Sequence, residues 1–278
     1  MTVMNSREQI STIEPRSSWT AGELEELWCY RDLFYFLAWR DVKVRYRQTV
    51  LGGLWAVLQP LMTMGIFTIF FGHLAGVPSD GLPYPLFVYT ALLPWQFFSN
   101  AVTSSGNSLI ASGQLISKVY FPRLIIPSSS ILCGLLDFAV AFTLLAPMMI
   151  YYGIVPGPGL LLLPFLMAGF VMAALGVGFI LSALNVHYRD FRYVIPFMVQ
   201  IWLFVTPVIY PASMVPERWR WVINLNPMAG LISAFRSSIL DRPVPWVDLA
   251  VSGLVVLLIF AIGLTVFLRM ERRFADVV

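Results

Sequence analysis

Charged residues are scarce in this sequence. Asp, Glu, Lys and Arg make up 12% of its 278 residues, whereas apolar residues make up 58%, and the mean hydropathy is +0.77. A water-soluble chain of this length needs more charge to keep its surface hydrated. The composition therefore excludes an ordinary soluble protein and indicates a chain solvated by lipid. The net charge of +3 is too small to indicate a nucleic-acid partner.

Residues that support catalysis or metal binding are also few. Cys29 and Cys133 have neither disulfide nor metal-ligand spacing. The two histidines, His73 and His187, fall on opposite sides of the predicted membrane and cannot share a metal ion. The sequence contains no phosphate-binding Gly-x-x-x-x-Gly-Lys-[Ser/Thr], no Gly-x-Ser-x-Gly and no His-Glu-x-x-His. It therefore predicts no catalytic residue, no metal site, no cofactor in this chain and no enzymatic activity.

Long apolar runs, in contrast, are plentiful. A helix needs about 20 apolar residues to cross the hydrocarbon core, and six runs suffice when tilt is allowed. Helices are expected because lipid leaves every backbone N–H and C=O to be paired within its own segment, and alternating strand patterns are absent. We predict an all-α membrane protein with six transmembrane helices at about residues 54–75, 86–110, 124–151, 160–184, 193–210 and 249–268.

The N-terminal region has a different composition from the rest. Residues 1–22 are polar and are predicted to form a flexible cytoplasmic N-terminus, while 49–278 form the transmembrane domain. Residues 23–48 have a helical pattern of apolar and charged positions that is too polar to span. This pattern favours an amphipathic helix lying in the membrane interface. A helix packed on a soluble domain is the alternative.

Two short helices are predicted between the fifth and sixth spans. Ser213 can cap the first helix, and Asn226-Pro227 can end it and begin the second. The two segments, 214–225 and 227–240, are too short to span. We interpret them as a re-entrant external helical hairpin, with a hairpin lying on the membrane surface as the alternative. Its apolar side chains would form an external gate, with the candidates Trp219, Trp221 and Phe235.

The distribution of Lys and Arg predicts the orientation. With both termini inside, 14 of the 18 basic residues are cytoplasmic and four are outside. Cytoplasmic connections carry the excess of Lys and Arg in membrane proteins. Both termini are therefore predicted to be cytoplasmic, in a multi-pass membrane protein. The four outside all lie in the long connection 211–248, at Arg218, Arg220, Arg236 and Arg242.

Asp137 is the one residue among Asp, Glu, Lys and Arg that lies inside the predicted spans. Proton-coupled carriers generally use a relay of such groups together with a structural repeat, and neither is visible in the sequence. Secondary transport is therefore disfavoured. Asp137 is interpreted either as a protonated carboxyl group or as a hydrogen-bonding partner of a neighbouring helix.

Aromatic residues account for 15% of the chain. Many fall at predicted membrane interfaces, where aromatic belts are expected. A second interpretation is that some line a pore, because the apolar face of a sugar ring can lie on an aromatic ring while its hydroxyl groups bond to amides. The candidates for this lining, from the second and fifth spans, are Trp95, Phe97, Phe98, Asn100, Phe197, Gln200, Trp202 and Phe204.

A short segment between the second and third spans is suited to act as a lever. Residues 112–123, Ser-Gly-Gln-Leu-Ile-Ser-Lys-Val-Tyr-Phe-Pro-Arg, are amphipathic and end beside the proline that precedes the next span. A partner that moves this segment would move both flanking helices.

Four stretches resemble one family. Residues 39–60, Trp-Arg-Asp-Val-Lys-Val-Arg-Tyr-Arg-Gln-Thr-Val-Leu-Gly-Gly-Leu-Trp-Ala-Val-Leu-Gln-Pro, are similar to the N-terminal signature of ABC-2 type permeases that export O-antigen, capsule and teichoic acid. Residues 118–123 resemble the coupling helix of that family. Residues 185–192, Asn-Val-His-Tyr-Arg-Asp-Phe-Arg, resemble its loop between the fourth and fifth spans, and 225–228, Leu-Asn-Pro-Met, its external hairpin.

The resemblance implies the permease subunit of an ATP-driven exporter of an undecaprenyl-linked polysaccharide such as O-antigen. Two copies of this chain would form the pore, in contact with membrane lipids, and two copies of a cytoplasmic ABC ATPase would bind ATP and Mg²⁺. The ATPase would contact the interface helix and the coupling residues Ser117, Lys118, Val119, Tyr120, Phe121, Pro122 and Arg123.

A basic cluster precedes the first span, at Arg40, Lys43, Arg45 and Arg47. It has three interpretations: contact with the ATPase, binding of the pyrophosphate of an undecaprenyl-pyrophosphate-linked glycan, or orientation by anionic lipid. For the whole chain, the alternative functions are an ABC-2 permease for another lipid or a drug, an ion-coupled carrier, and a membrane scaffold.

Overall fold

The computed structural model describes residues 28–47, 52–271 and 274. The part of the chain that it describes is all-helical. The predicted flexible segment 1–22 lies outside the described residues, as do residues 23–27 and 48 of the predicted interface helix.

The helices follow one another with short connections. The α-helices are α2 (Arg31–Tyr46), α3 (Trp55–Phe67), α4 (Tyr84–Ala111), α5 (Gly113–Ile116), α6 (Ile125–Phe142), α7 (Leu145–Tyr151), α8 (Leu163–His187), α9 (Phe191–Val205), α10 (Glu217–Asn224), α11 (Pro227–Ile239) and α12 (Trp246–Glu271). Two shorter pieces extend them: the π-helix η2 (Thr68–Leu74) continues α3, and the 3₁₀-helix η3 (Pro158–Leu162) leads into α8.

Four helical segments are long and apolar enough to cross a membrane. They are Gly52–Leu74, Ile125–Tyr151, Pro158–His187 and Trp246–Glu271, and α9 is a shorter apolar helix of the same kind. Many of their large apolar side chains are exposed on the chain, including Phe70, Phe165 and Leu254. Exposure of such residues is stable in hydrocarbon but not in water. The protein is therefore an all-helical membrane protein.

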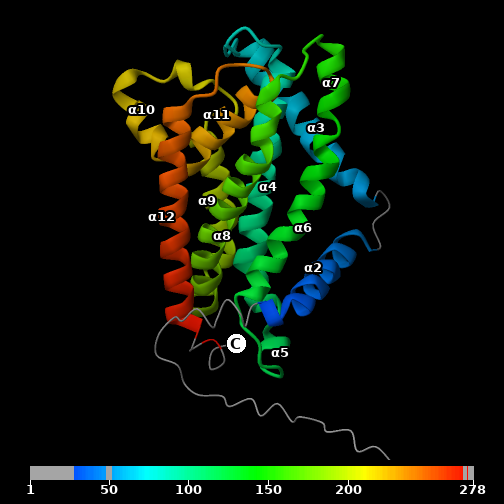
Figure 1. The fold of residues 1–278 in the computed structure, drawn as a ribbon, viewed down its shortest axis with the longest axis vertical. Helices are drawn as coiled ribbons and strands as arrows, with labels where there is room; N and C mark the ends of the chain where they lie inside the picture. The colour runs from blue at the N-terminus through cyan, green and yellow to red at the C-terminus, as the bar shows by residue number, and fades with distance from the viewer. Residues whose placement is uncertain (1–27, 48–51, 272–273, 275–278) are drawn as a thin grey trace, which may run out of the picture.

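Helix α4 occupies the centre of the bundle and differs from these segments. It is 28 residues long, and the 18 of them that are buried include both its apolar first half and residues such as Ser105 and Ser108. It packs against α3, α6, α8, α9 and α11 (Figure 1). Because protein rather than lipid surrounds it, α4 can carry more serine and asparagine than the lipid-facing helices.

The two ends of the bundle are built differently. At the lower end in Figure 1 lie α5, the beginning of α2 and the end of α12. The upper end holds the hairpin formed by α10 and α11, the end of α7 and the beginning of α12. Segments that the sequence analysis assigned to the cytoplasmic side thus gather at one end.

Two glycines let α8 and α12 approach without side chains between them. A Cβ atom at Gly176 would lie 2.8 Å from the Cα atom of Phe260, and a Cβ atom at Gly263 would overlap the carbonyl oxygen of Gly176. Small residues allow this close backbone packing in membrane helices. No larger residue fits at either position without separating the two helices.

Candidate transport and coupling sites

The predicted lever is a short helix followed by an irregular turn. Only Gly113–Ile116 form a helix, and the coupling residues follow it. The first four of these residues, Ser117, Lys118, Val119 and Tyr120, are exposed, with Tyr120 at 64%. Phe121 is 4% exposed. The segment therefore exposes its first four residues and packs Phe121 against the bundle.

Two contacts anchor this segment to the bundle. Phe121 packs in a cluster that includes Leu109, Ile125 and Phe267, from three different helices. The backbone N–H of Arg123 donates to Oε1 of Glu271 at 3.0 Å, and the Arg123 guanidinium donates to the Glu271 carbonyl oxygen. Arg123 thus connects the lever to the end of α12. Sequence reasoning missed Glu271, although a lone carboxylate closing the last apolar run was a usable signal.

Helix α2 has a packed side and an exposed aromatic side. Leu37 is 2% exposed and joins the same cluster as Phe121, with Phe34 packed against it. On the other side, Trp28, Tyr35 and Phe36 are each more than 60% exposed. Exposed aromatic side chains on a helix with charged neighbours are typical of the membrane interface.

The four residues of the predicted basic cluster, in α2 and at its C-terminal end, are in different surroundings. Arg40 pairs with Asp41 at 2.8 Å, and Arg45 pairs with Asp137 on α6. Lys43 and Arg47 are exposed, with the Lys43 ammonium 5.6 Å from the ring centre of Trp39. Of this cluster, Lys43 and Arg47 are thus the residues whose charges are most available to lipid or to a partner.

Asp137 forms a polar link between α6 and α2. Its carboxylate accepts hydrogen bonds from the Arg45 guanidinium and from the Tyr46 hydroxyl group. Arg45 also donates to Oγ of Ser104 on α4 at 3.4 Å. Burial, together with the hydrogen bond to Asp137, raises the pKa of Tyr46 above its ordinary value. The interpretation of Asp137 as a partner of a neighbouring helix fits this geometry.

A cavity of about 320 Å³ adjoins this link. It lies between α2, α3, α4 and α6, and its lining includes Arg45, Asp137, Gln59, Gln96 and Asn100. Aromatic rings complete the wall, from Trp55, Phe97 and Phe138. The cavity thus combines one ion pair with amides and rings, although no single sequence motif contains these residues.

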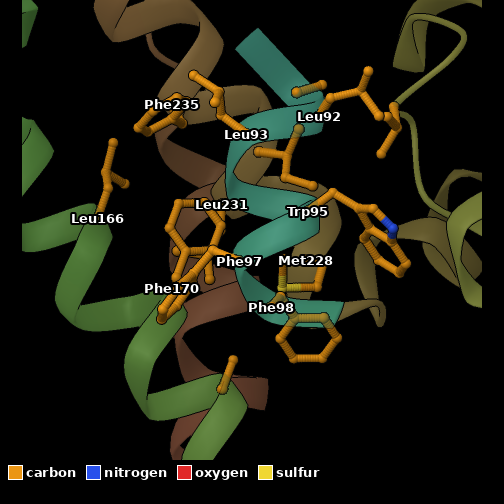
Figure 2. Close-up of a cluster of buried hydrophobic side chains, with 14 of the residues drawn as sticks. Leu92, Leu93, Trp95, Phe97, Phe98, Leu166, Phe170, Met228, Leu231 and Phe235 are labelled. Carbon is orange, nitrogen blue, oxygen red and sulfur yellow. The ribbon is translucent and has the colours of Figure 1, made fainter. Parts of the chain in front are cut away.

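The structure separates the candidate pore residues into two groups. Trp95, Phe97 and Phe98 are each 4% exposed or less, and they lie among Phe170 of α8 and residues of α11 (Figure 2). Trp95 and Phe98 thus pack within the chain, whereas Phe97 and Asn100 also line the cavity between α2, α3, α4 and α6. The assignment of these residues to a pore lining stays a prediction.

Most of the candidates on α9 are exposed. Phe197 and Phe204 are 65% and 54% exposed, and Gln200 between them is exposed as well. Their spacing of three and four residues places them on one face of α9. Trp202 points elsewhere: its indole N–H donates to Oδ1 of Asn226 at 3.0 Å.

The two short helices between α9 and α12, α10 and α11, are buried to different extents. No residue of α10 is buried, and Trp219 and Trp221 are 52% and 63% exposed. Helix α11, by contrast, packs among α4, α8 and α12, and Phe235 is fully buried there. The predicted gate residues therefore divide into two exposed rings and one packing residue, because α11 inserts into the bundle.

Arg236 on α11 is a buried cation with unusual partners. Its guanidinium lies 3.7 Å from the ring centre of Phe87, and it donates to the carbonyl oxygens of Phe87, Pro207 and Val208 at 3.2 to 3.4 Å. No carboxylate forms an ion pair with it in the described part of the chain. The sequence analysis counted Arg236 as an external loop charge, but its burial removes it from that count.

Residues 32–240 match the model of the ABC-2 type transporter family. The chain belongs to this family. An ABC-2 permease is the membrane subunit of a transporter in which a separate ABC ATPase subunit binds and hydrolyses ATP. The predictions of a permease without its own ATPase site and of an ATPase partner are thereby confirmed.

Several relatives of this ABC-2 permease cover nearly all of its length. It is 30% identical over 247 residues to the O-antigen export system permease protein RfbA of Klebsiella pneumoniae. The aligned residues make up 88% of this chain and 95% of the relative. It is 29% identical to the RfbA protein of Myxococcus xanthus over 91% of this chain and 98% of the relative. The polysialic acid transport protein KpsM of Escherichia coli is 20% identical over 84% of this chain and 91% of the relative.

Proposed function

We propose that this permease exports an undecaprenyl-linked polysaccharide, such as O-antigen, across the bacterial inner membrane. The observation that carries the proposal is the full-length similarity to permeases named for O-antigen export, at 30% identity over 88% of the chain. The exposed face of α9, with Phe197, Gln200 and Phe204, supports it. Rings and an amide on one face suit a cargo with apolar ring faces and hydroxyl groups.

The proposed assembly holds two copies of this chain and two copies of the ATPase. Each chain would cross the membrane six times, with α4 and α9 as spans beside the four long apolar segments, and α10–α11 would dip back from the outer side. Both termini would then be cytoplasmic. The burial of α11 among the spans, and the gathering of α5 and the end of α12 at one end (Figure 1), support this arrangement.

The first test is biochemical. Proteoliposomes containing this chain and its ATPase should accumulate polyprenyl-linked polysaccharide in an ATP-dependent manner, as measured with a radiolabelled glycan. The purified chain without the partner should show no ATP hydrolysis, because its sequence contains no phosphate-binding loop. ATP-independent export, or turnover by a preparation free of the ATPase, would overturn the proposal.

The second test separates the two faces of the lever. Replacing exposed Tyr120 by Ala should uncouple the complex: ATP hydrolysis continues and export falls, while the unfolding temperature is unchanged. Replacing buried Phe121 by Ala should abolish export as well, and should also cost about 3 kcal/mol of stability because it leaves a cavity in the packed cluster. Loss of stability in both variants, or normal export by both, would contradict the assignment of the lever.

A variant at Arg123 extends this test. Arg123→Ala should reduce export while leaving membrane insertion intact, since it removes the guanidinium that contacts Glu271 but keeps the backbone hydrogen bond. Glu271→Gln serves as the matched control because it retains the acceptor oxygen, and it should export normally. Full export by Arg123→Ala would exclude this contact from the coupling path.

A further inference from the structure

Three amide side chains line the cavity between α2, α3, α4 and α6 without protein partners. Gln59 on α3 and Gln96 and Asn100 on α4 form no side-chain hydrogen bond within residues 28–47, 52–271 and 274. Each amide group offers two donors and an acceptor. Within a membrane protein such groups need a polar partner, because hydrocarbon provides none. The cavity is therefore suited to water or to a ligand rich in hydrogen-bonding groups.

The charge of the cavity favours a neutral ligand. The Arg45 cation is already paired with the Asp137 carboxylate, so that the two together contribute no net charge. An anion that approached Arg45 would meet Asp137 at the same place. A hydroxyl group, in contrast, can donate to the carboxylate, which has about four acceptor sites, of which Arg45 and Tyr46 occupy two.

The remaining wall is aromatic. The rings of Trp55, Phe97 and Phe138 line the same cavity as the amides. Flat apolar rings beside carboxylate and amide groups match a sugar, which has an apolar face of C–H groups and an edge of hydroxyl groups. At about 320 Å³, the cavity lies at the small end of the range of about 300–1,000 Å³ for ligand sites. Trp55 and Gln59 are exposed, so the cavity opens to the surface of the chain.

We propose that this cavity is a binding site for one neutral pyranose unit, within each copy of the chain and separate from the exposed face of α9. Gln59, Gln96, Asn100 and Asp137 bind its hydroxyl groups, and Trp55 and Phe97 contact its ring face. The proposal rests on the proposed export of a polysaccharide and adds a holding site for it. When one sugar unit is bound at this site, the glycan is held and does not move backwards between two transport cycles.

The test uses the complete complex with its ATPase, in nanodiscs and without ATP. The neutral probes are the methyl glycosides of glucose, galactose, mannose and N-acetylglucosamine. Inorganic pyrophosphate is the anionic probe. Saturation-transfer NMR should detect binding of at least one methyl glycoside. Gln96→Leu and Asn100→Leu should each weaken this binding about fivefold, because each removes a hydrogen bond. Thr265→Val, on the exposed surface of α12 outside the cavity, should bind as the unaltered protein does.

The unfolding temperature of each variant serves as a control for this comparison. The amides of Gln96 and Asn100 have no partners within the described residues, so their replacement by Leu should leave the unfolding temperature unchanged or raise it. Gln59→Leu, at an exposed position, provides a third variant that should weaken binding without affecting the packed bundle. Glycoside binding that survives all three replacements, or that is absent for every methyl glycoside, would overturn the proposal.

Two further results separate this site from the proposed function. Binding of pyrophosphate that is lost in the same variants would overturn the assignment of a neutral sugar, and would identify an anion site instead. ATP-dependent export is measured in parallel on the unaltered complex. If that complex exports polysaccharide while the three Leu variants bind glycosides normally, the holding site is refuted and the export function stands. If it exports nothing, the export function fails independently of the glycoside result.

Discussion

Asp137 and Arg236 are both charges within the apolar body of the protein, and the bundle stabilises them in opposite ways. Asp137 has two partners, the charged side chain of Arg45 and the hydroxyl group of Tyr46, both from α2. Arg236 has no carboxylate partner among the described residues and is held by three carbonyl oxygens and the ring of Phe87. The first arrangement joins two separate helices by an ion pair. In the second, the partial negative charges of backbone carbonyl oxygens stabilise the cation.

This difference indicates what each charge does for the fold. The carbonyl groups of Pro207 and Val208 lie in the turn after α9, and Phe87 lies in the first turn of α4. Arg236 therefore connects three parts of the outer half through groups that no substitution of the partner can remove. The Asp137–Arg45 contact depends on two replaceable side chains, so a double substitution can remove both charges together.

The largest effect is expected for Arg236→Met. The variant keeps an unbranched apolar side chain but removes all three hydrogen bonds and the cation over Phe87. Hydrogen bonds to a charged group contribute about 1.5–3 kcal/mol each and are not additive, so we expect a loss of at least about 3 kcal/mol. Thermal unfolding of the purified protein in nanodiscs measures it. An unfolding temperature equal to that of the unaltered protein would show that Arg236 is not a structural clamp.

An intermediate effect is expected for Asp137→Asn. The change leaves the Arg45 cation partly buried without its counter-charge, which costs about 1–2 kcal/mol after allowance for its partial exposure. Arg45→Gln combined with Asp137→Asn should recover most of this loss, because amides at both positions can bond to each other. If the double variant is as unstable as the sum of the single ones, the ion pair is not the link described here.

The same variant addresses ion-coupled transport. A carrier that uses Asp137 as its proton site would lose export in Asp137→Asn and would respond to collapse of the proton gradient. For an ATP-driven exporter, export by Asp137→Asn should instead follow its stability and remain insensitive to the gradient. Proteoliposomes with an ionophore provide this measurement.

The smallest effect is expected for Arg40→Gln. Arg40 pairs with Asp41 at 2.8 Å, but 40% of its side chain is exposed. Exposed ion pairs contribute about 0–1 kcal/mol, so the unfolding temperature should change little. A loss as large as that of Asp137→Asn would show that position in the bundle does not decide how much an ion pair contributes.

The sequence was sufficient to predict the elements whose signal is local. The apolar runs place α3, α6, α8 and α12, and the break at Asn226-Pro227 separates α10 from α11 as predicted, with the Asn226 side chain accepting from the backbone of Met228. These features depend on the length of a run or on a cap within a few residues. Family membership was likewise recognisable from four short stretches.

What the sequence could not predict depends on contacts between distant segments. The aromatic residues of α4 have the same composition whether they line a pore or pack against neighbouring helices, so the sequence does not reveal that Phe98 is fully buried. The partner of Asp137 lies 92 residues away on α2. Arg236 looked like an external charge because nothing in the 227–240 pattern reveals that neighbouring helices enclose it.

The glycine contact between α8 and α12 also bears on how closely the bundle is held together. Where the two backbones touch directly, at Gly176 and Gly263, there is room for hydrogen atoms only, so the contact itself sets the distance between the two helices. A side chain added at either position would push α8 and α12 apart, together with the elements that pack against each of them.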